Sequence, residues 1–225
     1  MKKKVLNIDV IVEVRTTSKR LPKKALKEIL GRPVIELMIE RLKKIKKIRH
    51  IILTTTMNKS DDALVDIAKK NKIQYFRGST LNVLDRVLKT AKYYKTDIIV
   101  EITGDNPLVD PDISSKIIKF FLKNIDHYDF VSNDGEVYKV KKKKNSTLGF
   151  STKIFKTDLL NQVNKLTQNK VDREHVVNYI LKNPLKFKIY DHPLPEYLKN
   201  TSYRLTMDYI EDFRLISEIY RNLYP

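Results

Sequence analysis

The stretch that decides the fold lies near the middle of the chain and reads Asp97-Ile98-Ile99-Val100-Glu101-Ile102-Thr103-Gly104-Asp105-Asn106-Pro107. Its first six residues are mostly apolar, and a short apolar run bounded by turn residues is typical of a strand buried on both faces. Gly, Asp, Asn and Pro then follow within five residues, and such clusters end strands. The stretch predicts a buried strand that leads into a polar turn.

Strand-like and helix-like segments alternate on both sides of this stretch. We expect strands at 5–14, 50–55, 73–76 and 97–102, and helices at 34–45, 61–70, 83–94 and 112–122. Ser60 or Asp61 is expected to cap the second of these helices, and Asp112 the fourth. This alternation predicts an α/β fold with a mostly parallel sheet and helices on both faces. Ligand sites in such sheets lie at the carboxyl ends of strands, here the loops after Val14 and Ile102.

The pattern changes near residue 134. Residues 134–147 are polar and include four consecutive lysines, so we expect the segment 134–150 to form an extended arm. Beyond it, strands are expected at 148–155, 185–190 and 203–207, and helices at 157–163, 172–182 and 208–222. Neither an internal repeat nor a flexible linker is visible, so residues 1–225 are interpreted as a single domain with a projecting arm.

The chain is strongly basic, with 45 Lys and Arg against 27 Asp and Glu and a formal net charge of +18. A basic surface can bind nucleic acid or an anionic membrane. Alternatively, lysine is the common polar residue of this sequence, and one local basic pocket binds phosphates. Arg and aromatic residues are not interleaved as in common RNA-binding modules, so a nucleic-acid partner is not expected.

Cysteine usage and hydropathy restrict the kind of metal site and the cellular location that we expect for the protein. The chain has no cysteine, which excludes disulfides and thiolate metal ligands. No stretch approaches the about 20 apolar residues of a membrane span, and residues 5–14 are interrupted by polar side chains, unlike a signal peptide. We therefore expect a cytoplasmic protein without a membrane partner.

The loop after the first strand is rich in cations. Five fall within ten residues, accompanied by the hydroxyl of Ser18: Arg15, Lys19, Arg20, Lys23 and Lys24. Arg binds phosphate oxygens as a fork and Lys as a point charge, and a triphosphate needs such donors. The alternative is an ordinary solvated basic loop. The position of this loop at the end of a strand favours an anion-binding site over that alternative.

Two aspartates, Asp105 and Asp208, each follow an expected strand. A carboxylate in this position can bind a hard cation such as Mg²⁺ through oxygen. The alternatives are an Asx turn at Asp105, with Asp110 or Asp112 as helix cap, and a helix cap at Asp208. If the two strands are neighbours, both aspartates could share one metal ion, but sequence spacing does not determine that distance.

Taken in order, six segments resemble the cytidylyltransferase family of CMP-sialate and CMP-Kdo synthetases, in particular its branch of spore-coat polysaccharide protein F-like proteins. The segments start at Val14, Gly31, Arg77, Thr103, Asp172 and Leu205, and read VRTTSKRLPKK, GRPVIE, RGSTLNVLDR, TGDNPLVD, DREHV and LTMDYIED. They span about residues 5–220. The resemblance implies a Rossmann-like nucleotidyltransferase fold of the glycosyltransferase-A type, a three-layer α/β/α arrangement.

The resemblance also implies roles for individual residues. The catalytic residues would be Lys24, Arg15 and Asp105, and the metal ligands of Mg²⁺ would be Asp105 and Asp208. The nucleotide would be bound by Val14, Arg15, Ser18, Arg20, Lys24, Arg77, Asp85 and Gly104. The sugar substrate would be bound by Arg173, Glu174 and His175. The arm at 134–150 would join two subunits of a homodimer.

The activity implied is transfer of a nucleoside monophosphate from an NTP, first CTP, to a sugar with release of pyrophosphate. A nonulosonic acid of the sialic, legionaminic or Kdo type is the first acceptor to consider, and the product would supply surface glycans. GTP with a hexosamine 1-phosphate is an alternative within the same chemistry. A glycosyltransferase on the same fold and a non-catalytic nucleic-acid-binding protein are alternatives of other classes. The chain departs from the family pattern at Lys23, where glycine is usual, and at Glu13, where glutamine or proline is common.

Overall fold

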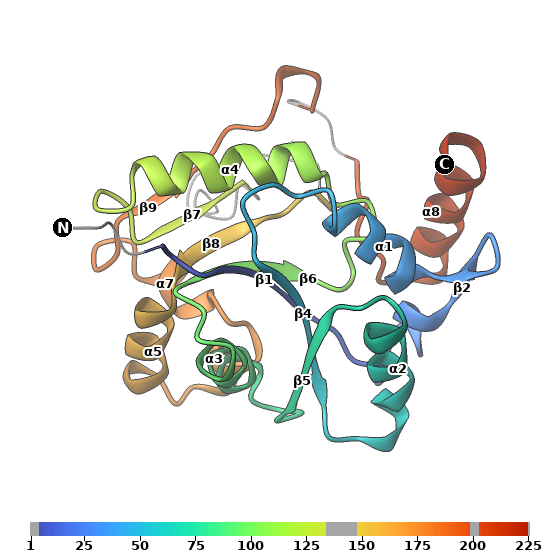
Figure 1. Ribbon diagram of the computed structural model, residues 1–225, viewed down its shortest axis with the longest axis horizontal. Coiled ribbons are helices and arrows are strands. Elements are labelled where there is room, and N and C mark those ends of the chain that lie inside the picture. The colour runs from blue at the N-terminus through green and yellow to red at the C-terminus, as the bar shows by residue number, and fades with distance from the viewer. Residues whose placement is uncertain (1–4, 134–147, 199–202, 225) are drawn as a thin grey trace.

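The computed structural model describes residues 5–133, 148–198 and 203–224. Its centre is a seven-stranded sheet with the strand order β5-β4-β1-β6-β8-β7-β9 (Figure 1). The strands are β1 Ile8–Glu13, β4 His50–Thr56, β5 Gln74–Gly78, β6 Ile98–Thr103, β7 Phe130–Ser132, β8 Lys153–Lys156 and β9 Ile189–Asp191. Within this sheet β8 runs antiparallel to both of its neighbours and the other pairings are parallel. The expected mostly parallel sheet is confirmed.

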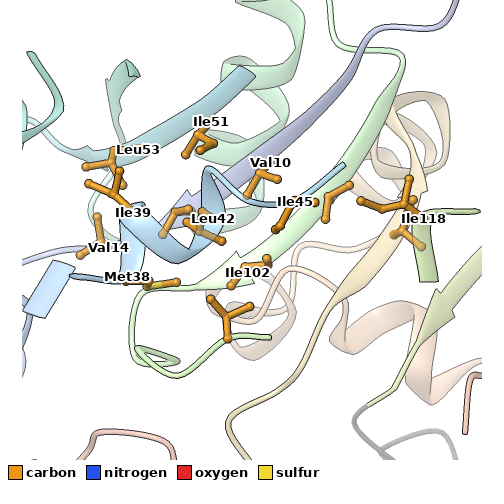
Figure 2. Packing of buried hydrophobic residues seen from close by; sticks show 14 of the residues in the cluster. Val10, Val14, Met38, Ile39, Leu42, Ile45, Ile51, Leu53, Ile102 and Ile118 are labelled. Carbon is orange, nitrogen blue, oxygen red and sulfur yellow. The ribbon is translucent and has the colours of Figure 1, made fainter. Parts of the chain in front are cut away.

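Helices cover both faces of the sheet, which gives three layers. The helices are α1 Val34–Leu42, α2 Asp62–Lys70, α3 Val83–Tyr93, α4 Pro111–Lys123, α5 Thr157–Leu166, α6 Lys170–Glu174, α7 Asn178–Lys182 and α8 Ile210–Leu223. Apolar side chains of α1, α2 and α4 pack with Val10 and Ile102 of the sheet (Figure 2). Those of α3, α5 and α7 pack with Ile11 and Ile99 on the opposite face. Neighbouring residues of one strand thus enter different cores, because side chains alternate across a sheet.

A third, smaller core attaches the C-terminal helix. Met207, Ile216 and Tyr220 pack against α1 and against the hairpin β2 Glu28–Ile29 and β3 Arg32–Pro33. The Tyr220 hydroxyl donates to the carbonyl of Pro107, 2.8 Å away, and burial raises the pKa of Tyr220 to about 12. Helix α8 is thereby held beside the loop that follows β6.

The strand order creates a crevice at the predicted edge of the sheet. After β1 the chain builds β4 and β5 on one side, then crosses to place β6 on the other side of β1. The loops that leave the carboxyl ends of β1 and β6 therefore diverge from adjacent strands, the position where open α/β sheets bind ligands. The two loops that the strand-end rule selected from the sequence thus leave neighbouring strands.

Several expected elements were wrong in extent or type. The strand expected at 203–207 is a single bridge between Arg204 and Leu148, and the strand expected at 148–155 begins only at Lys153. The helix expected at 172–182 is two short helices, α6 and α7. The hairpin β2–β3 was missed because its turn uses positive φ at Leu30 and Gly31, and leucine is no signal for such a turn. Strand β7 was missed as well.

Two helix caps also differ from expectation. The side chain of Asp110, and not that of Asp112, caps α4 by accepting from the N–H groups of Asp112 and Ile113, both at 2.8 Å. Asp61 is the last residue of the short 3₁₀ helix η2 Lys59–Asp61 and stands at the N-cap position of α2, but its side chain makes no cap hydrogen bond. Among the described residues, further 3₁₀ segments are η1 Lys24–Leu26 and η4 Glu196–Leu198. Residues 134–147, most of the predicted arm, lie outside the described residues.

Within the described ranges, every helix is too short or too polar to cross a membrane.

Candidate active site

A cleft of about 740 Å³ opens at the carboxyl ends of β1 and β6. Most of the predicted site residues line it, although they come from segments far apart in the sequence. They are Val14, Arg15, Ser18, Arg20, Lys24, Gly104, Asp105, Glu174, His175 and Asp208. The fold therefore assembles one concave site, lined by side chains of both charges, from the segments that stood out separately in the sequence.

The floor of the cleft is formed where β1 and β6 end side by side. The N–H of Gly104 donates to the Glu13 carbonyl at 2.9 Å. A Cβ atom on residue 104 would lie 2.9 Å from that same oxygen and 2.9 Å from Cβ of Val14. Glycine is needed at position 104 because the two backbones approach closely here.

The cationic loop is fixed at its start by a buried carboxylate, Asp61. Its Oδ1 accepts from the N–H and the hydroxyl of Thr16, at 2.8 and 2.6 Å. Its Oδ2 accepts from the hydroxyl of Thr55 at 2.8 Å, and from the N–H and hydroxyl of Thr56 at 3.1 and 2.5 Å. Burial alone would raise the pKa of Asp61, but these hydrogen bonds outweigh it and hold the pKa below its ordinary value. Asp61 thus connects the loop after β1 to the end of β4, a role that the sequence did not indicate.

The loop then makes a left-handed turn at Lys23, with φ 53° and ψ 30°. The Lys23 N–H donates to the Thr16 carbonyl at 3.0 Å, and the Lys23 carbonyl accepts from the Leu26 N–H at 2.8 Å. Lysine in place of glycine has therefore not prevented the left-handed conformation. The turn returns the chain so that Lys24 opens η1 and extends into the cleft.

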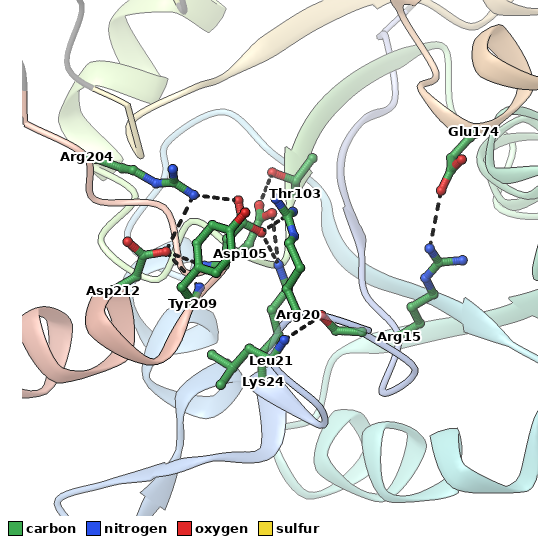
Figure 3. A network of polar contacts seen from close by, with 12 residues as sticks. Arg15, Arg20, Leu21, Lys24, Thr103, Asp105, Glu174, Arg204, Tyr209 and Asp212 are labelled. Atoms are coloured by element: carbon green, nitrogen blue, oxygen red, sulfur yellow. Dashed lines mark hydrogen bonds and ion pairs between the residues drawn. The ribbon is translucent and has the colours of Figure 1, made fainter.

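Lys24 bridges the two aspartates proposed from the sequence as metal ligands. Its Nζ lies 3.1 Å from Oδ2 of Asp105 and 3.1 Å from Oδ1 of Asp208 (Figure 3). The hydroxyl of Thr103 donates to the other oxygen of Asp105 at 2.6 Å. The two carboxylates thus converge on one point in the cleft, as a shared metal site requires.

Asp208 is surrounded by further positive charge. Arg20 donates to its Oδ1 at 2.7 Å, and Arg204 to its Oδ2 at 3.1 Å. Both guanidinium groups also lie over the ring of Tyr209, at 5.2 and 5.3 Å from its centroid. Arg204 also pairs with Asp212 at 3.5 Å. The sequence reasoning missed Arg204, because a lone arginine near the end of the chain carried no positional signal.

Charge balance determines the protonation of Asp105. Burial by itself would raise the pKa of this carboxyl, but Lys24 and the Thr103 hydroxyl outweigh burial, and the pKa lies below its ordinary value. Asp105 is therefore ionised at neutral pH and is available as an oxygen ligand for a cation.

The donor set fits a hard divalent cation. Asp105 and Asp208 offer carboxylate oxygens that already share one cationic partner, Lys24. Within the described part of the chain no group of three or more His, Cys, Asp or Glu side chains gathers around a common point. Such a pair suits Mg²⁺, which is usually held by one or two carboxylates together with water and substrate phosphates.

Arg15 faces another wall of the cleft. One of its terminal nitrogens donates to the Thr80 carbonyl at 3.2 Å, and the other pairs with Glu174 at 3.4 Å. His175 lines the cleft beside Glu174. Two of the three residues predicted to bind the sugar thus lie at the cleft.

Arg77 and Asp85 lie away from the cleft lining. The Arg77 guanidinium donates to the carbonyls of Thr56 and Asn58, at 2.8 and 2.6 Å, and pairs with Asp62 at 2.5 Å. Asp85 pairs with the neighbouring Lys89 on α3, at 2.8 Å. In the structure, therefore, both side chains stabilise the surroundings of β5 and α3.

Arg173 is likewise absent from the cleft lining. Its guanidinium donates to the side-chain and backbone carbonyls of Asn164, the latter at 2.8 Å, and so ties α6 to α5. The neighbouring residues Glu174 and His175 do line the cleft, because α6 ends at Glu174 and the chain turns there.

Four charged residues that the sequence reasoning did not select as a group meet behind the cleft: Glu13, Arg86, Glu101 and Lys153. Glu13 and Arg86 line the cleft, and Lys153 pairs with Glu101 at 3.7 Å. The sequence did contain a signal for this cluster, because these charged residues interrupt the apolar pattern of buried strands and of a helix. A charged side chain at a core position is costly unless it is paired.

Fold and cleft together define a nucleotidyltransferase of the Rossmann-like α/β class. The chain belongs to the cytidylyltransferase family, whose model matches residues 10–224. The protein MJ1063 of Methanocaldococcus jannaschii is 41% identical over 94% of this chain and 82% of its own length. The spore coat polysaccharide biosynthesis protein SpsF of Bacillus subtilis is 27% identical over 94% of this chain and 85% of its own.

Solved structures agree with this assignment. A cytidylyltransferase from Leptospira borgpetersenii superposes with a TM-score of 0.89 at 31% identity, covering 98% of this chain and 89% of that one. A CMP:2-keto-3-deoxy-manno-octonic acid synthetase complexed with CTP has a TM-score of 0.72 at 12% identity, covering 96% and 99%. At this low identity the second likeness concerns the fold. The resemblance noted in the sequence is confirmed, and so is the fold class that it implied.

Proposed function

We propose that the protein transfers CMP from CTP to a sugar acid of the nonulosonic type and releases pyrophosphate. The observation that carries the proposal is the meeting, in one cleft, of the cationic loop after β1 with the carboxylates of Asp105 and Asp208. Membership of the cytidylyltransferase family supports CTP as the donor. The surface-glycan role is supported by likeness to a spore coat polysaccharide biosynthesis protein.

The triphosphate would bind to the loop at 15–24. Arg15, Arg20 and Lys24 direct three cations from this short loop into the cleft, and Ser18 lines it as well. Cationic and hydroxyl donors on one rigid turn match the oxygens of a polyphosphate. Asp61 holds the start of the loop through Thr16, so the donors are positioned before substrate binds.

The metal ligands would be Asp105 and Asp208. Mg²⁺ bound there would neutralise charge on the α-phosphate and on the departing pyrophosphate. Lys24 contacts both carboxylates and lines the cleft, so its ammonium can also contact phosphate oxygens as negative charge grows. Arg15 and Arg20 would stabilise the same charge from two sides. The acceptor hydroxyl attacks the α-phosphorus in line with the leaving group, and positioning supplies much of the rate.

The acceptor would bind near Glu174 and His175. Arg15, at the start of the phosphate loop, extends its side chain to this wall and pairs with Glu174. A guanidinium at this point suits the carboxylate of a sugar acid, since Arg binds carboxylates as a fork. A hexosamine 1-phosphate would present a phosphate to the same arginine, so acceptors of both kinds belong in the test.

Three further predictions from the sequence remain to be tested. They are the single-domain organisation of residues 1–225, the homodimer joined by the arm at 134–150, and the cytoplasmic location. The arm falls mostly outside the described residues, so sedimentation of the full chain is the appropriate test of the dimer.

The decisive experiment measures pyrophosphate release in the presence of Mg²⁺. CTP, GTP, UTP and ATP are crossed against nonulosonic acids and sugar 1-phosphates. We expect release with CTP and one sugar acid, and its loss in Asp105→Asn. Asp66→Asn, an exposed change of the same kind on α2, is the matched control. Release with GTP and a sugar 1-phosphate would identify those compounds as the substrates in place of the proposed ones. No pyrophosphate release with any combination of NTP and sugar would refute the proposal.

A further inference from the structure

Arg204 contacts Asp208, but the proposed mechanism gives this arginine no role. Its Nη2 donates to Oδ2 of Asp208 at 3.1 Å and lies 3.5 Å from Oδ2 of Asp212, in the first turn of α8. Figure 3 shows the guanidinium beside Asp212 and the ring of Tyr209. Arg204 itself is not among the residues that line the cleft. This one arginine therefore joins a proposed metal ligand to the start of the last helix.

The two oxygens of the Asp208 carboxylate have different partners. Oδ1 accepts from Lys24 at 3.1 Å and from Arg20 at 2.7 Å, and the same Lys24 ammonium lies 3.1 Å from Oδ2 of Asp105. Lys24 and Arg20 both line the cleft. Oδ2 accepts instead from Arg204. The carboxylate thus presents one oxygen to the cleft and the other to Arg204.

Arg204 is the cation that can stay with Asp208 when substrate binds. Three cations contact this carboxylate within the described part of the chain, namely Lys24, Arg20 and Arg204. The first two are the groups that we assign to the triphosphate. When they turn to phosphate oxygens, the carboxylate keeps its orientation only if another group holds it. Arg204 is placed to do so because it contacts the oxygen that faces away from Lys24.

The backbone fixes the position from which Arg204 acts. The Leu148 N–H donates to the carbonyl of Tyr203, and the Leu205 N–H donates to the carbonyl of Leu148, both at 2.9 Å. Gly149 follows with φ 112°, and a Cβ atom there would lie 2.7 Å from the carbonyl carbon of Leu205. Glycine permits this close approach. Arg204 therefore starts from a segment that is paired with a distant part of the chain.

Asp212 fixes the arginine and the aspartate together. Its Oδ2 accepts from the N–H groups of Asp208 and Tyr209, both at 2.8 Å, and the same oxygen pairs with Arg204. The guanidinium of Arg204 also lies over the Tyr209 ring, 5.3 Å from its centroid. The backbone and the side chain of Asp208 are thus held by the same group of residues.

We propose that Arg204 is a positioning residue for the metal site, which holds Oδ2 of Asp208 so that Oδ1 faces Asp105. This inference rests on the proposed function, in which the two aspartates bind Mg²⁺. Groups that hold metal ligands in place contribute to metal affinity without touching the metal, and their loss typically costs about 10–100-fold. The positive charge of Arg204 has the opposite effect, because it repels a second cation. The sign of the change on removing Arg204 therefore separates positioning from charge.

The test compares the affinity for CTP with and without Mg²⁺, measured by calorimetry on the full chain. The ratio of the two affinities reports the contribution of the metal, and a change that affects the nucleotide alone cancels in it. Asp208→Asn defines the ratio that remains when a metal ligand is lost. In Arg204→Gln we expect the ratio to fall about tenfold or more from the wild-type value. Arg204→Lys keeps the charge but not the fork of donors, so its ratio should fall less.

Arg214→Gln is the matched control, because it is the same substitution at an exposed position of α8. Its ratio should equal that of the wild type. The Arg204 side chain is 44% exposed, so we expect its variants to fold, and thermal unfolding checks this. If Arg204→Gln does not fold, Arg204→Lys provides the test, with the same direction of change.

An unchanged or higher ratio in the Arg204 variants would overturn this inference and leave the proposed function standing. A wild-type ratio equal to that of Asp208→Asn would overturn the inference together with the assignment of Asp208 as a metal ligand. Absence of CTP binding by the wild type, with or without Mg²⁺, would overturn the proposed function as well.

Discussion

Lys24 and Asp208 are 184 positions apart in the sequence, yet Nζ of Lys24 lies 3.1 Å from Oδ1 of Asp208. The lysine comes from the loop after the first strand and the aspartate from the segment that precedes the last helix. Helix α8 brings them together, since Tyr220 and Met207 attach it to the core beside the β6 loop. The site is therefore completed by the last helix along the chain, which packs against α1 and the β2–β3 hairpin.

Lys24→Met should abolish most of the activity. The methionine keeps the apolar stem and removes the charge that contacts both carboxylates and faces the phosphates. We expect kcat/KM for pyrophosphate release to fall about 100-fold or more, as for loss of one preorganised group that stabilises a transition state. Lys119→Met, an exposed change on α4, is the matched control. An equal, small effect of both variants would show that Lys24 has no part in the reaction.

Asp61→Asn should destabilise the protein by about 2–4 kcal/mol at neutral pH, because one of the two buried carboxylate oxygens becomes an NH2 group, which cannot accept from the donors of Thr16 or from those of Thr55 and Thr56. Urea unfolding measures this change, with Asp66→Asn as the exposed control.

The same residue predicts an acid dependence. The pKa of Asp61 is lower in the folded protein than in the unfolded chain. Its contribution to stability is therefore present above the unfolded pKa and is lost as the pH falls towards the folded pKa. The difference in unfolding free energy between wild type and Asp61→Asn should shrink in acid. A difference that is constant over the acid range would contradict the assigned role.

Lys23→Gly should stabilise the protein by about 1 kcal/mol. A non-glycine residue in the left-handed region costs about 1–3 kcal/mol, and the greater flexibility of glycine in the unfolded chain offsets part of the gain. Lys23→Ala removes the charge and keeps the strained backbone, so it separates the two effects in urea unfolding. A gain in Lys23→Ala equal to that in Lys23→Gly would assign the effect to charge.

Gly104→Ala should distort the floor of the cleft. The added methyl group would contact the Glu13 carbonyl and Val14 at 2.9 Å, so the ends of β1 and β6 must separate. We expect a loss of about 1–3 kcal/mol in stability and weaker CTP binding, measured by unfolding and calorimetry. Unchanged CTP binding would mean that this approach of the two strands does not shape the nucleotide site.

Much of the fold follows from local pattern. The alternation of apolar strands with amphipathic helices determined a mostly parallel sheet, because each period fixes which side chains are buried. The strand-end rule then located the cleft, since the loops after Val14 and Ile102 leave adjacent strands. The cationic loop and the two aspartates were selected from the sequence for the same reason. Charged side chains directly after buried strands are candidates for a ligand site or for a helix cap.

The tertiary structure decided what these residues contact. Asp61 was expected to cap α2, yet its side chain binds the loop through Thr16. The family resemblance implied that Arg77 and Asp85 bind the nucleotide, yet neither side chain lines the cleft. Long-range packing selects among partners that are equally available locally, and no spacing along the chain encodes that choice.

The sequence by itself determined the layered α/β fold, the family and the edge of the sheet where chemistry takes place, because periodicity and ordered motifs are local properties. Only the tertiary structure decided that Lys24 bridges Asp105 and Asp208, and that Glu13 meets Glu101 and Arg86 in the wall of the cleft. Those contacts depend on how distant strands and helices pack, and the protonation of a buried carboxyl depends on the neighbours that packing supplies.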